Sequence, residues 1–439
     1  MHGSCVDGSS SFSRVHRESN LREGPPLPDT QSITGDVSLK ALPGLSGVKA
    51  LFRPAMSRAR GYPASRRLAI ASLLSGARTP KKSVEMEACI FKPDRLGDFV
   101  LALGAIRLLL ETFGEDRCVL VLSPFASELA ALEFPRTPRV VVPALGGDFL
   151  REAVWPWFHT RRVLGRYRFK KLICLRHHRY LSHDVVLTWI RAAGSYGTNG
   201  GMLAAVPGEA AVFSTRFPGD SGYPATARPG FCRELEAHLQ TCKAALGGTI
   251  DRDNVIPVLR HIDPSEGDGV LVSPFSSSPH KDYPLEKMAS AISDVQSWQS
   301  VPIRVCVSRA DGSRGGRLVE LLRQNRMIKS ELLVPGSVEE YVKAVNGARI
   351  VFTVDTATAH IATALDKPTV VIIGGAHYGF FGPWSRSGKQ KWLTNHLDCF
   401  QCNGNCIYPE FRCVSDVPPQ SISRALESLS LPREVPQTR

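Results

Sequence analysis

No apolar run in this 439-residue chain approaches the ~20 residues that a membrane-spanning helix needs. We therefore expect a soluble protein, or at most one that is peripheral to a membrane. Acidic residues are missing from residues 37–84, which carry ten Lys or Arg. With only Phe52 and Tyr62, this segment also lacks the regularly interleaved aromatic side chains that stack on single-stranded nucleic acid. The basic segment alone therefore does not predict a nucleic-acid-binding protein.

The first 84 residues differ from the rest of the chain in charge and composition. They hold a net charge of +8, against +5 for the remaining 355 residues. They are rich in Ser, Gly, Pro and Arg and show no sustained apolar period, which is typical of disorder. We predict a disordered basic extension over residues 1–85. A membrane-surface or targeting role for it stays open, as does a natural start of the protein at Met86.

Cysteine is present eleven times, but without the pattern of a disulfide framework. Four of these residues fall in apolar, strand-like runs, where a free thiol behaves as a small hydrophobic side chain: Cys89, Cys118, Cys174 and Cys306. This usage favours a reducing compartment. We expect a cytoplasmic protein that could act at the inner face of the cytoplasmic membrane.

From residue 88 onward, short apolar runs alternate with longer helical ones, which is typical of parallel sheets covered on both faces. Two such series predict two Rossmann-like α/β domains, 86–247 and 268–439, joined by a linker at 248–267. Residues 199–229 break the rhythm and predict a loop at the rim of the first sheet. Facing domains of this kind place a ligand cleft between the carboxyl ends of their strands.

The predicted strands are 89–92, 118–122, 140–142, 171–175, 270–274, 303–307, 331–334, 350–354 and 369–373. The predicted helices are 98–113, 124–133, 148–166, 183–193, 231–246, 284–296, 314–324, 338–346 and 358–365.

Asp98 follows the first predicted strand across a turn, in the run Lys92-Pro93-Asp94-Arg95-Leu96-Gly97-Asp98. A carboxylate at the carboxyl end of a strand in an open α/β sheet lies where ligands bind. As the first polar residue of the following helix, Asp98 is also an N-cap candidate. Both roles stay open at this point.

Two segments of the second series have the composition of an anion site. Residues 273–281 carry Ser276, Ser277 and Lys281, whose hydroxyls and ammonium can donate to a diphosphate. A Ser-rich turn with a solvated lysine would have the same composition and is the alternative interpretation. Residues 354–360 place Asp355 and Thr356 at a strand end before a helix, whose free N–H groups attract anions. There too, a simple helix cap is an alternative.

Together these segments resemble glycosyltransferase family 9, the heptosyltransferase-like enzymes of bacterial lipopolysaccharide core assembly. The family's Arg-x-x-x-Gly-Asp turn is matched by Arg95-Leu96-Gly97-Asp98, one spacer short. Its Lys-x-Trp-Pro segment is matched by Lys281-Asp282-Tyr283-Pro284, with Tyr in place of Trp. Its Asp-Thr-Gly-x-x-His element is matched by Asp355-Thr356-Ala357-Thr358-Ala359-His360. Phe381-Gly382-Pro383-Trp384 and the cysteines after it also look like the family.

The resemblance implies a metal-independent, inverting glycosyltransferase of the GT-B type, with no required cofactor. It implies that Asp98 is the general base and that Ser276, Ser277, Lys281 and Thr356 bind the donor diphosphate. Asp355 and His360 would bind the donor sugar, although His360 could equally be a packed helix residue. The implied donor is an ADP-linked sugar such as heptose. The implied acceptor is a lipid-linked or oligosaccharide glycan of the lipopolysaccharide core.

The sequence departs from the family pattern at two places. Ala357 stands where the family's element has Gly, so the backbone there would approach a phosphate less closely. The family's Gly-x-x-Glu segment appears as Val307-Ser308-Arg309-Ala310-Asp311. These departures motivate one alternative, a degenerate glycosyltransferase fold that only binds. A second alternative is a non-catalytic nucleic-acid-binding protein that uses the basic arm and the cysteine cluster.

The only clustered cysteines lie near the end of the chain, at Cys399, Cys402, Cys406 and Cys413. Four thiolates this close in sequence could close a tetrahedral zinc site. The spacing is irregular for a common zinc finger, so free or paired thiols are the other interpretation. A catalytic role is not expected for this cluster.

Overall fold

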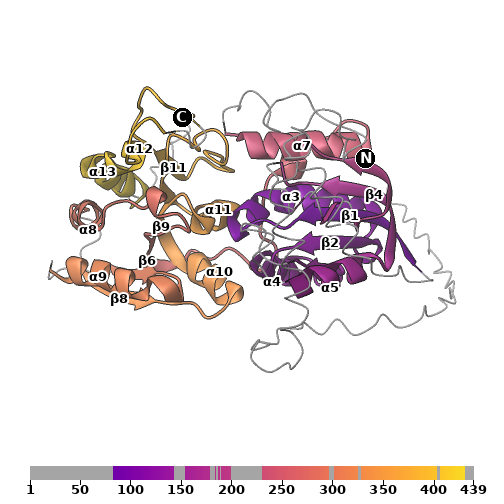
Figure 1. Cartoon of the computed structure of the whole chain (residues 1–439). Helices are drawn as coiled ribbons and strands as arrows, with labels where there is room; N and C mark the ends of the chain where they lie inside the picture. The colour runs from indigo at the N-terminus through magenta and orange to yellow at the C-terminus, as the bar shows by residue number, and fades with distance from the viewer. Residues whose placement is uncertain are drawn as a thin grey trace, which may run out of the picture. The chain divides into compact units, whose positions relative to one another are not determined.

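The computed structural model describes residues 83–142, 154–177, 183, 186, 187, 189–198, 230–295, 301–324, 328–402 and 406–430 (Figure 1). All of these described residues belong to one compact unit, residues 46–439. The predicted basic extension lies outside the described residues up to residue 82, and the predicted rim loop at 199–229 lies outside them entirely. No helix in the described part of the chain is both long and apolar enough to cross a membrane.

Five strands form the first sheet in the order β3-β2-β1-β4-β5, and every pairing is parallel. The parallel sheet that the sequence predicts is confirmed, but β5 occupies the end of the helix predicted at 183–193. The strands are β1 (Val84–Lys92), β2 (Cys118–Leu122), β3 (Arg139–Val141), β4 (Tyr167–Cys174) and β5 (Ala192–Tyr196). The helices are α3 (Leu96–Phe113), α4 (Pro124–Glu133), α5 (Val154–Leu164) and α7 (Arg233–Leu246).

Six strands form the second sheet in the order β11-β10-β9-β6-β7-β8, again with parallel pairings throughout. Its strands are β6 (Asp268–Ser273), β7 (Pro302–Cys306), β8 (Lys329–Leu333), β9 (Ala348–Val354), β10 (Thr369–Ile372) and β11 (Gln390–Leu393). Its helices are α8 (Leu285–Ser293), α9 (Gly312–Arg323), α10 (Val338–Asn346), α11 (Ala357–Ala364), α12 (Arg412–Ser415) and α13 (Pro419–Ser430). β11, α12 and α13 were not predicted from the sequence.

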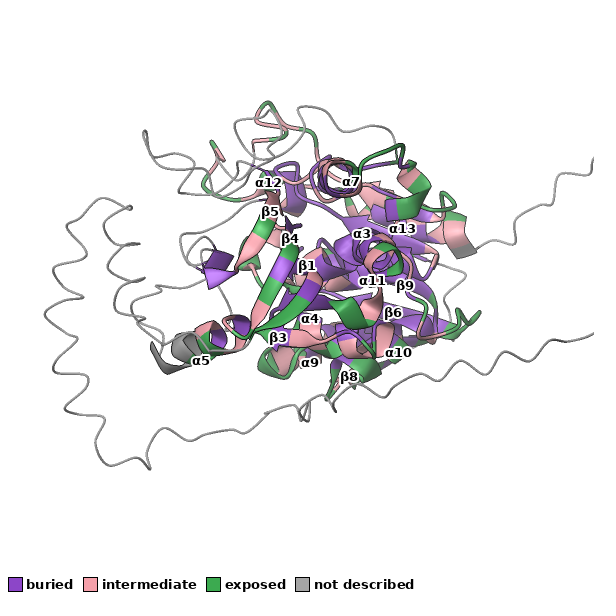
Figure 2. Ribbon diagram, turned by 90° about the vertical axis from the view of Figure 1, so that its right-hand side faces the viewer, coloured by how far each residue is buried: buried purple, intermediate pink, exposed green. Residues whose placement is uncertain are grey.

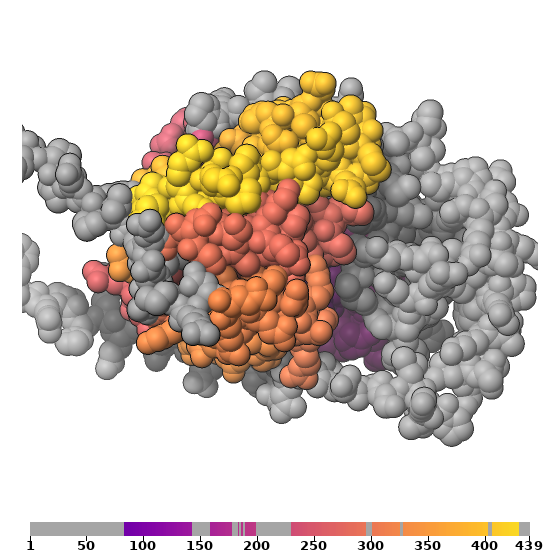
Figure 3. Space-filling model, turned by 90° about the vertical axis from the view of Figure 1, so that its left-hand side faces the viewer, coloured from indigo at the N-terminus to yellow at the C-terminus, as the bar shows by residue number. Residues whose placement is uncertain are grey.

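The last helix, α13, covers the second sheet beside α8. In Figure 3 the yellow C-terminal residues lie directly over the salmon residues that include α8. Ser423 of α13 donates a hydrogen bond of 2.9 Å to the Ala291 carbonyl of α8. Ile422 and Leu426 are fully buried in the core of this sheet. The chain's end is therefore part of the second α/β layer.

Helix α3 is apolar around most of its circumference because it packs against α7 on one side and α11 on another (Figures 1 and 2). Two of its glycines permit neighbouring segments to approach closely. A Cβ at Gly104 would lie 2.3 Å from the Val255 carbonyl, and a Cβ at Gly97 would lie 3.1 Å from the His360 ring. The first turn of α3 is thereby held directly against the first turns of α11.

The segment predicted as a linker, 248–267, is held by polar contacts in its second half. Glu133 of α4 accepts hydrogen bonds of 2.8 Å from the Arg260 N–H and 3.1 Å from the His261 N–H. Ser265 donates a bond of 2.7 Å to the Asn346 carbonyl of α10. These contacts fix the path of the chain between α7 and β6.

Candidate functional site

The predicted site residues lie where strands of both sheets end. Asp98 is in the first turn of α3, the helix after β1. Lys281 ends the short turn Pro279–Lys281 after β6, and Asp355 directly follows β9. The charges of Lys281 and Asp355 both act on the Asp98 carboxyl. The structure therefore brings residues from three separate segments into electrostatic reach of one another.

Asp98 is not the N-cap of its helix. The cap is Arg95, and Leu96 and Gly97 are already helical, so the capping interpretation of Asp98 is wrong. No hydrogen bond or ion pair joins the Asp98 side chain to the described residues. A carboxylate of this kind keeps its oxygens available to a ligand.

Burial raises the pKa of Asp98 above its usual value, and the negative charges of Glu234 and Asp355 raise it further. The positive charges of Lys92 and Lys281 oppose this shift without cancelling it. A carboxylate with a raised pKa is a stronger proton acceptor than an ordinary aspartate. The environment of Asp98 thus suits a general base.

Asp355 has the opposite environment. It is buried, and its Oδ2 accepts bonds of 2.8 Å from Lys281 Nζ and 3.0 Å from His377 Nδ1. Burial alone would raise the pKa of this carboxyl, but the charge of Lys281 and the hydrogen bond from His377 together hold it well below its usual range. Asp355 is therefore an anion at every ordinary pH.

His377 was missed by sequence reasoning. It follows β10 in the run Gly374-Gly375-Ala376-His377, which matches none of the motifs used above. Its only sequence signal is a histidine just beyond the end of a strand in a parallel sheet, which is where ligands bind.

Helix α11 begins at the same edge as Asp355. Thr356 is its N-cap residue, yet the Thr356 side chain makes no capping hydrogen bond. Backbone N–H groups of the first turn of a helix are anion-binding donors. The Ala357 Cα lies 3.3 Å from the position that a Cβ on Gly97 would take, so this first turn lies against α3.

His360 is a packed helix residue. Its Nδ1 accepts a hydrogen bond of 3.2 Å from Trp384 Nε1, and its ring stacks on the Trp384 indole. Burial lowers the pKa of His360 to about 4. This neutral, buried imidazole packs between Trp384 and Gly97, where it holds the first turn of α11 against α3.

In the loop after β6, the hydroxyls of Ser276 and Ser277 have different hydrogen-bond roles. Ser276 Oγ donates to the Ser278 carbonyl at 2.7 Å, so its proton is already engaged. Ser277 Oγ accepts a bond of 2.5 Å from Arg95 Nη1, which leaves the Ser277 proton to donate. No role was predicted for Arg95, although it stands in the Arg95-Leu96-Gly97-Asp98 turn. It joins the turn after β1 to the loop after β6.

A buried ionic cluster lies beneath the Asp98 turn, and it too was missed. Lys92 is 1% exposed, and its Nζ lies 2.8 Å from Glu234 Oε1 and 3.1 Å from Asp94 Oδ2. It also donates to the Leu175 carbonyl at 3.0 Å. Arg176 forms a second ion pair with Asp94. A lysine that ends an apolar strand was the sequence signal for this cluster.

Part of this cluster has the composition of a metal site. Within the described residues, His177, Glu234 and His238 place their ligand atoms within 4.8 Å of one another. However, Lys92 Nζ already lies 2.8 Å from Glu234 Oε1 and 3.4 Å from His238 Nε2. A metal cation there would meet this positive charge at close range. We interpret the cluster as an ion-pair support for the Asp98 turn.

The comparisons with known proteins bear on this geometry. Residues 238–408 match the model of "Glycosyltransferase family 9 (heptosyltransferase)". The predicted resemblance to glycosyltransferase family 9 is confirmed. Lipopolysaccharide heptosyltransferase 1 of Pseudomonas aeruginosa is 28% identical over 162 residues, which cover 31% of this chain and 44% of that protein. The match thus spans less than half the length of this curated relative.

The fold agrees with solved heptosyltransferases. ADP-heptose lipopolysaccharide heptosyltransferase II of E. coli aligns with a TM-score of 0.56 at 14% identity, over 79% of this chain and 98% of that one. The E. coli heptosyltransferase WaaC with ADP aligns with a TM-score of 0.55 at 15% identity, over 78% of this chain and 100% of that one. The predicted GT-B fold class, two parallel-sheet α/β domains, is confirmed.

Proposed function

We propose that this protein is an inverting glycosyltransferase that moves a sugar, heptose, from an ADP-activated donor to a lipopolysaccharide-core or related glycan acceptor. The observation that carries the proposal is the arrangement of Asp98, Lys281 and Asp355 at strand ends of the two sheets. The likeness to family 9 supports the reaction class, and the ADP complex of the similar WaaC supports the choice of nucleotide.

In this proposal Asp98 is the general base. Its carboxylate takes the proton of an acceptor hydroxyl as the hydroxyl oxygen bonds to the anomeric carbon of the donor. The bond from that carbon to the diphosphate oxygen breaks, and ADP leaves with the electron pair. Attack from the face opposite the leaving group inverts the anomeric centre. The raised pKa of Asp98 favours this proton transfer.

The second sheet binds the donor. Lys281, the Ser277 hydroxyl and the N–H groups at Thr356 donate to the diphosphate, while Ser276 shapes the loop. This positive charge stabilises the leaving ADP, so we propose that transfer requires no catalytic metal. Asp355 accepts from donor sugar hydroxyls, and His360 keeps the first turn of α11 in place.

Two further parts of the proposal concern partners and place. We propose that a lipid-linked or oligosaccharide acceptor approaches Asp98 from the first sheet and that the protein acts in the cytoplasm with peripheral membrane contact. Nucleic acid is not an expected partner, because the basic residues of 37–84 lack the regularly interleaved aromatic side chains that stack on single strands.

Calorimetric titration of the full-length protein with ADP, UDP, GDP and CDP tests the proposal. We expect selective binding of ADP, and a loss of about tenfold or more in ADP affinity in Lys281→Ala, because a charge-assisted bond to the diphosphate is removed. The matched control is Lys287→Ala on α8, whose ammonium binds the Ser415 carbonyl and should leave ADP affinity unchanged. Absence of nucleotide binding, or equal loss in both variants, contradicts the proposal.

A further inference from the structure

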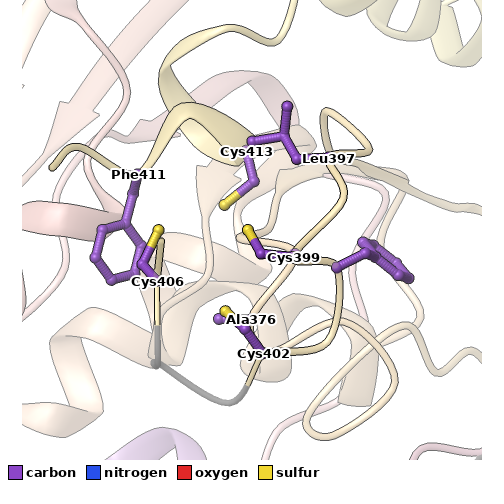
Figure 4. Close-up of a pocket in the computed structure, with 9 residues that line it drawn as sticks. Ala376, Leu397, Cys399, Cys402, Cys406, Phe411 and Cys413 are labelled. Carbon is purple, nitrogen blue, oxygen red and sulfur yellow. The ribbon is translucent and has the colours of Figure 1, made fainter. Parts of the chain in front are cut away.

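The four clustered cysteines line one pocket of the second α/β layer. Cys399, Cys402, Cys406 and Cys413 surround it together with apolar side chains from Ala376, Leu397, Phe400 and Phe411 (Figure 4). Figure 4 shows the sulfur atoms of Cys399, Cys406 and Cys413 turned toward the same space. Residues from two sides of a loop thus converge on one small volume.

The backbone around the pocket is shaped for this convergence. Gln401, between Cys399 and Cys402, has a φ of 64°, a left-handed conformation that turns the chain back sharply. Its N–H donates to the Gly375 carbonyl at 2.9 Å. A Cβ at Gly375 would lie 3.1 Å from the Phe400 ring and 3.4 Å from the Cys413 Cβ. Glycine at 375 therefore leaves the room in which the cysteines meet.

The other cysteines described by the structure have a different setting. Cys89, Cys118, Cys174, Cys232, Cys242 and Cys306 are all buried in the two cores. Three of the clustered cysteines, Cys399, Cys402 and Cys406, keep partial exposure, and Cys413 closes the pocket from α12. Thiols that a metal can reach, with an apolar wall behind them, are the arrangement that a structural site needs.

We propose that Cys399, Cys402, Cys406 and Cys413 bind one Zn²⁺ in a tetrahedral site of four thiolates. Zinc–sulfur bonds of about 2.3 Å place such sulfurs about 3.8 Å apart. The four sulfurs are not among the groups of described ligand atoms that all lie within 4.8 Å of one another. Binding therefore draws the cysteines together, and each coordinating thiol releases its proton to solvent as the zinc–sulfur bond forms.

This site would brace the loop that follows β10. The Cys413 carbonyl accepts a bond of 2.9 Å from the Asn395 N–H after β11, and a Cβ at Gly374 would lie 3.8 Å from the Cys413 Sγ. The same loop carries His377, which binds Asp355, and its Gly379 carbonyl accepts a bond of 2.9 Å from the Arg233 N–H of α7. Zinc thus ties the C-terminal segment to a loop that reaches both sheets. The zinc assignment does not depend on the proposed function.

Metal analysis of the purified full-length protein tests the proposal. We expect one zinc per chain, released when a mercurial reagent titrates the thiols and detected with a metallochromic dye. Cys402→Ser and Cys413→Ser should lose the zinc, and Cys402→His should retain it, because imidazole also binds zinc. The control Cys306→Ala, a buried cysteine of β7, should retain the full zinc content.

Folding defects are separated from metal loss by reconstitution. Metal-free wild-type protein should bind Co²⁺ with intense thiolate-to-cobalt absorption, and its thermal midpoint should rise on adding Zn²⁺. Cys402→Ser should retain the metal-free midpoint and fail to respond. Disulfides among the four cysteines in mass spectra of the alkylated protein, iron in place of zinc, or equal zinc in Cys402→Ser and Cys306→Ala would overturn the proposal.

Discussion

Asp98 and Asp355 occupy corresponding places in the two sheets, each just beyond a strand and at the start of a helix, yet their charges are controlled in opposite ways. On the first sheet, the buried cation Lys92 pairs with Glu234 and Asp94, and its charge only partly opposes the burial of Asp98. On the second sheet, Lys281 binds Asp355 directly and His377 adds a second donor. The pKa of Asp98 is raised and that of Asp355 is lowered.

The difference shows how one topology produces two kinds of carboxylate. The position at the strand end exposes a side chain to ligands, but the neighbouring cation decides whether that side chain exchanges protons. In our account, Asp98 takes a proton during transfer, and Asp355 stays charged to hold Lys281 and sugar hydroxyls in place. The following predictions test that division, beginning with the largest expected effect.

Asp98→Asn removes the proton acceptor while keeping the shape of the side chain. Turnover, measured as ADP released from an ADP-heptose donor, should fall by about 100-fold or more, the usual contribution of a general base. ADP affinity measured by calorimetry should stay within about twofold. The control Asp253→Asn changes an exposed carboxyl of the turn Arg252–Val255 and should leave both values unchanged. Full turnover in Asp98→Asn would remove Asp98 from the mechanism.

Lys92→Met leaves Glu234 and Asp94 buried without their cation. The free energy of unfolding in urea should fall by about 3–5 kcal/mol, as in other broken buried ion pairs. Lys170→Met is the control, since Lys170 pairs with Glu87 at the surface of the same sheet and its side chain is 66% exposed. That change should cost less than about 1 kcal/mol. Equal losses in the two variants would mean that the buried cluster does not support the Asp98 turn.

His360 predicts a pH dependence of stability. Its folded pKa of about 4 lies below the unfolded value of 6.5, so the unfolded chain binds the additional proton between these values. The contribution is fully present above pH 6.5 and is lost as pH falls toward 4. Between pH 7 and 5, wild-type protein should lose about 2 kcal/mol more unfolding free energy than His360→Phe.

The control for this titration is His159→Gln, an exposed histidine of α5. It should lose as much unfolding free energy between the two pH values as wild-type protein does. A pH dependence in His360→Phe that equals the wild-type one would contradict the buried, neutral state of His360.

The smallest expected effect concerns the contact of Arg95 with Ser277, which joins the two strand-end regions. A double-mutant cycle with Arg95→Ala and Ser277→Ala should give a coupling energy of about 0.5–1.5 kcal/mol in urea unfolding. A coupling of zero would show that this exposed bond does not hold the two loops together.

Much of the fold could be predicted from the sequence, because apolar strands and amphipathic helices alternate with clear turns. β2, α4 and α10 have the predicted boundaries, and other elements shift by a few residues. β5 was missed, since Ala192-Ala193-Gly194 gives no strand signal, and β11 was missed because it follows a long loop.

The candidate site was predictable only where its residues stand in motifs. Asp98, Lys281 and Asp355 do, and the structure places them within electrostatic reach. His377 lies 22 residues from Asp355, and Glu234 lies 136 residues from Asp98, and neither stands in a motif. The protonation states of the two aspartates depend on those distant partners, so they could not be predicted from the sequence.

The most direct test of the central claim is a carboxyl-carbon NMR titration of aspartate-labelled protein, with resonances assigned from Asp98→Asn and Asp355→Asn. We predict that the resonance lost in Asp98→Asn titrates above the ordinary aspartate pKa. The resonance lost in Asp355→Asn should remain that of a carboxylate to the lowest pH at which the protein stays folded. The reverse order, with Asp355 protonated before Asp98 as pH falls, would contradict the account.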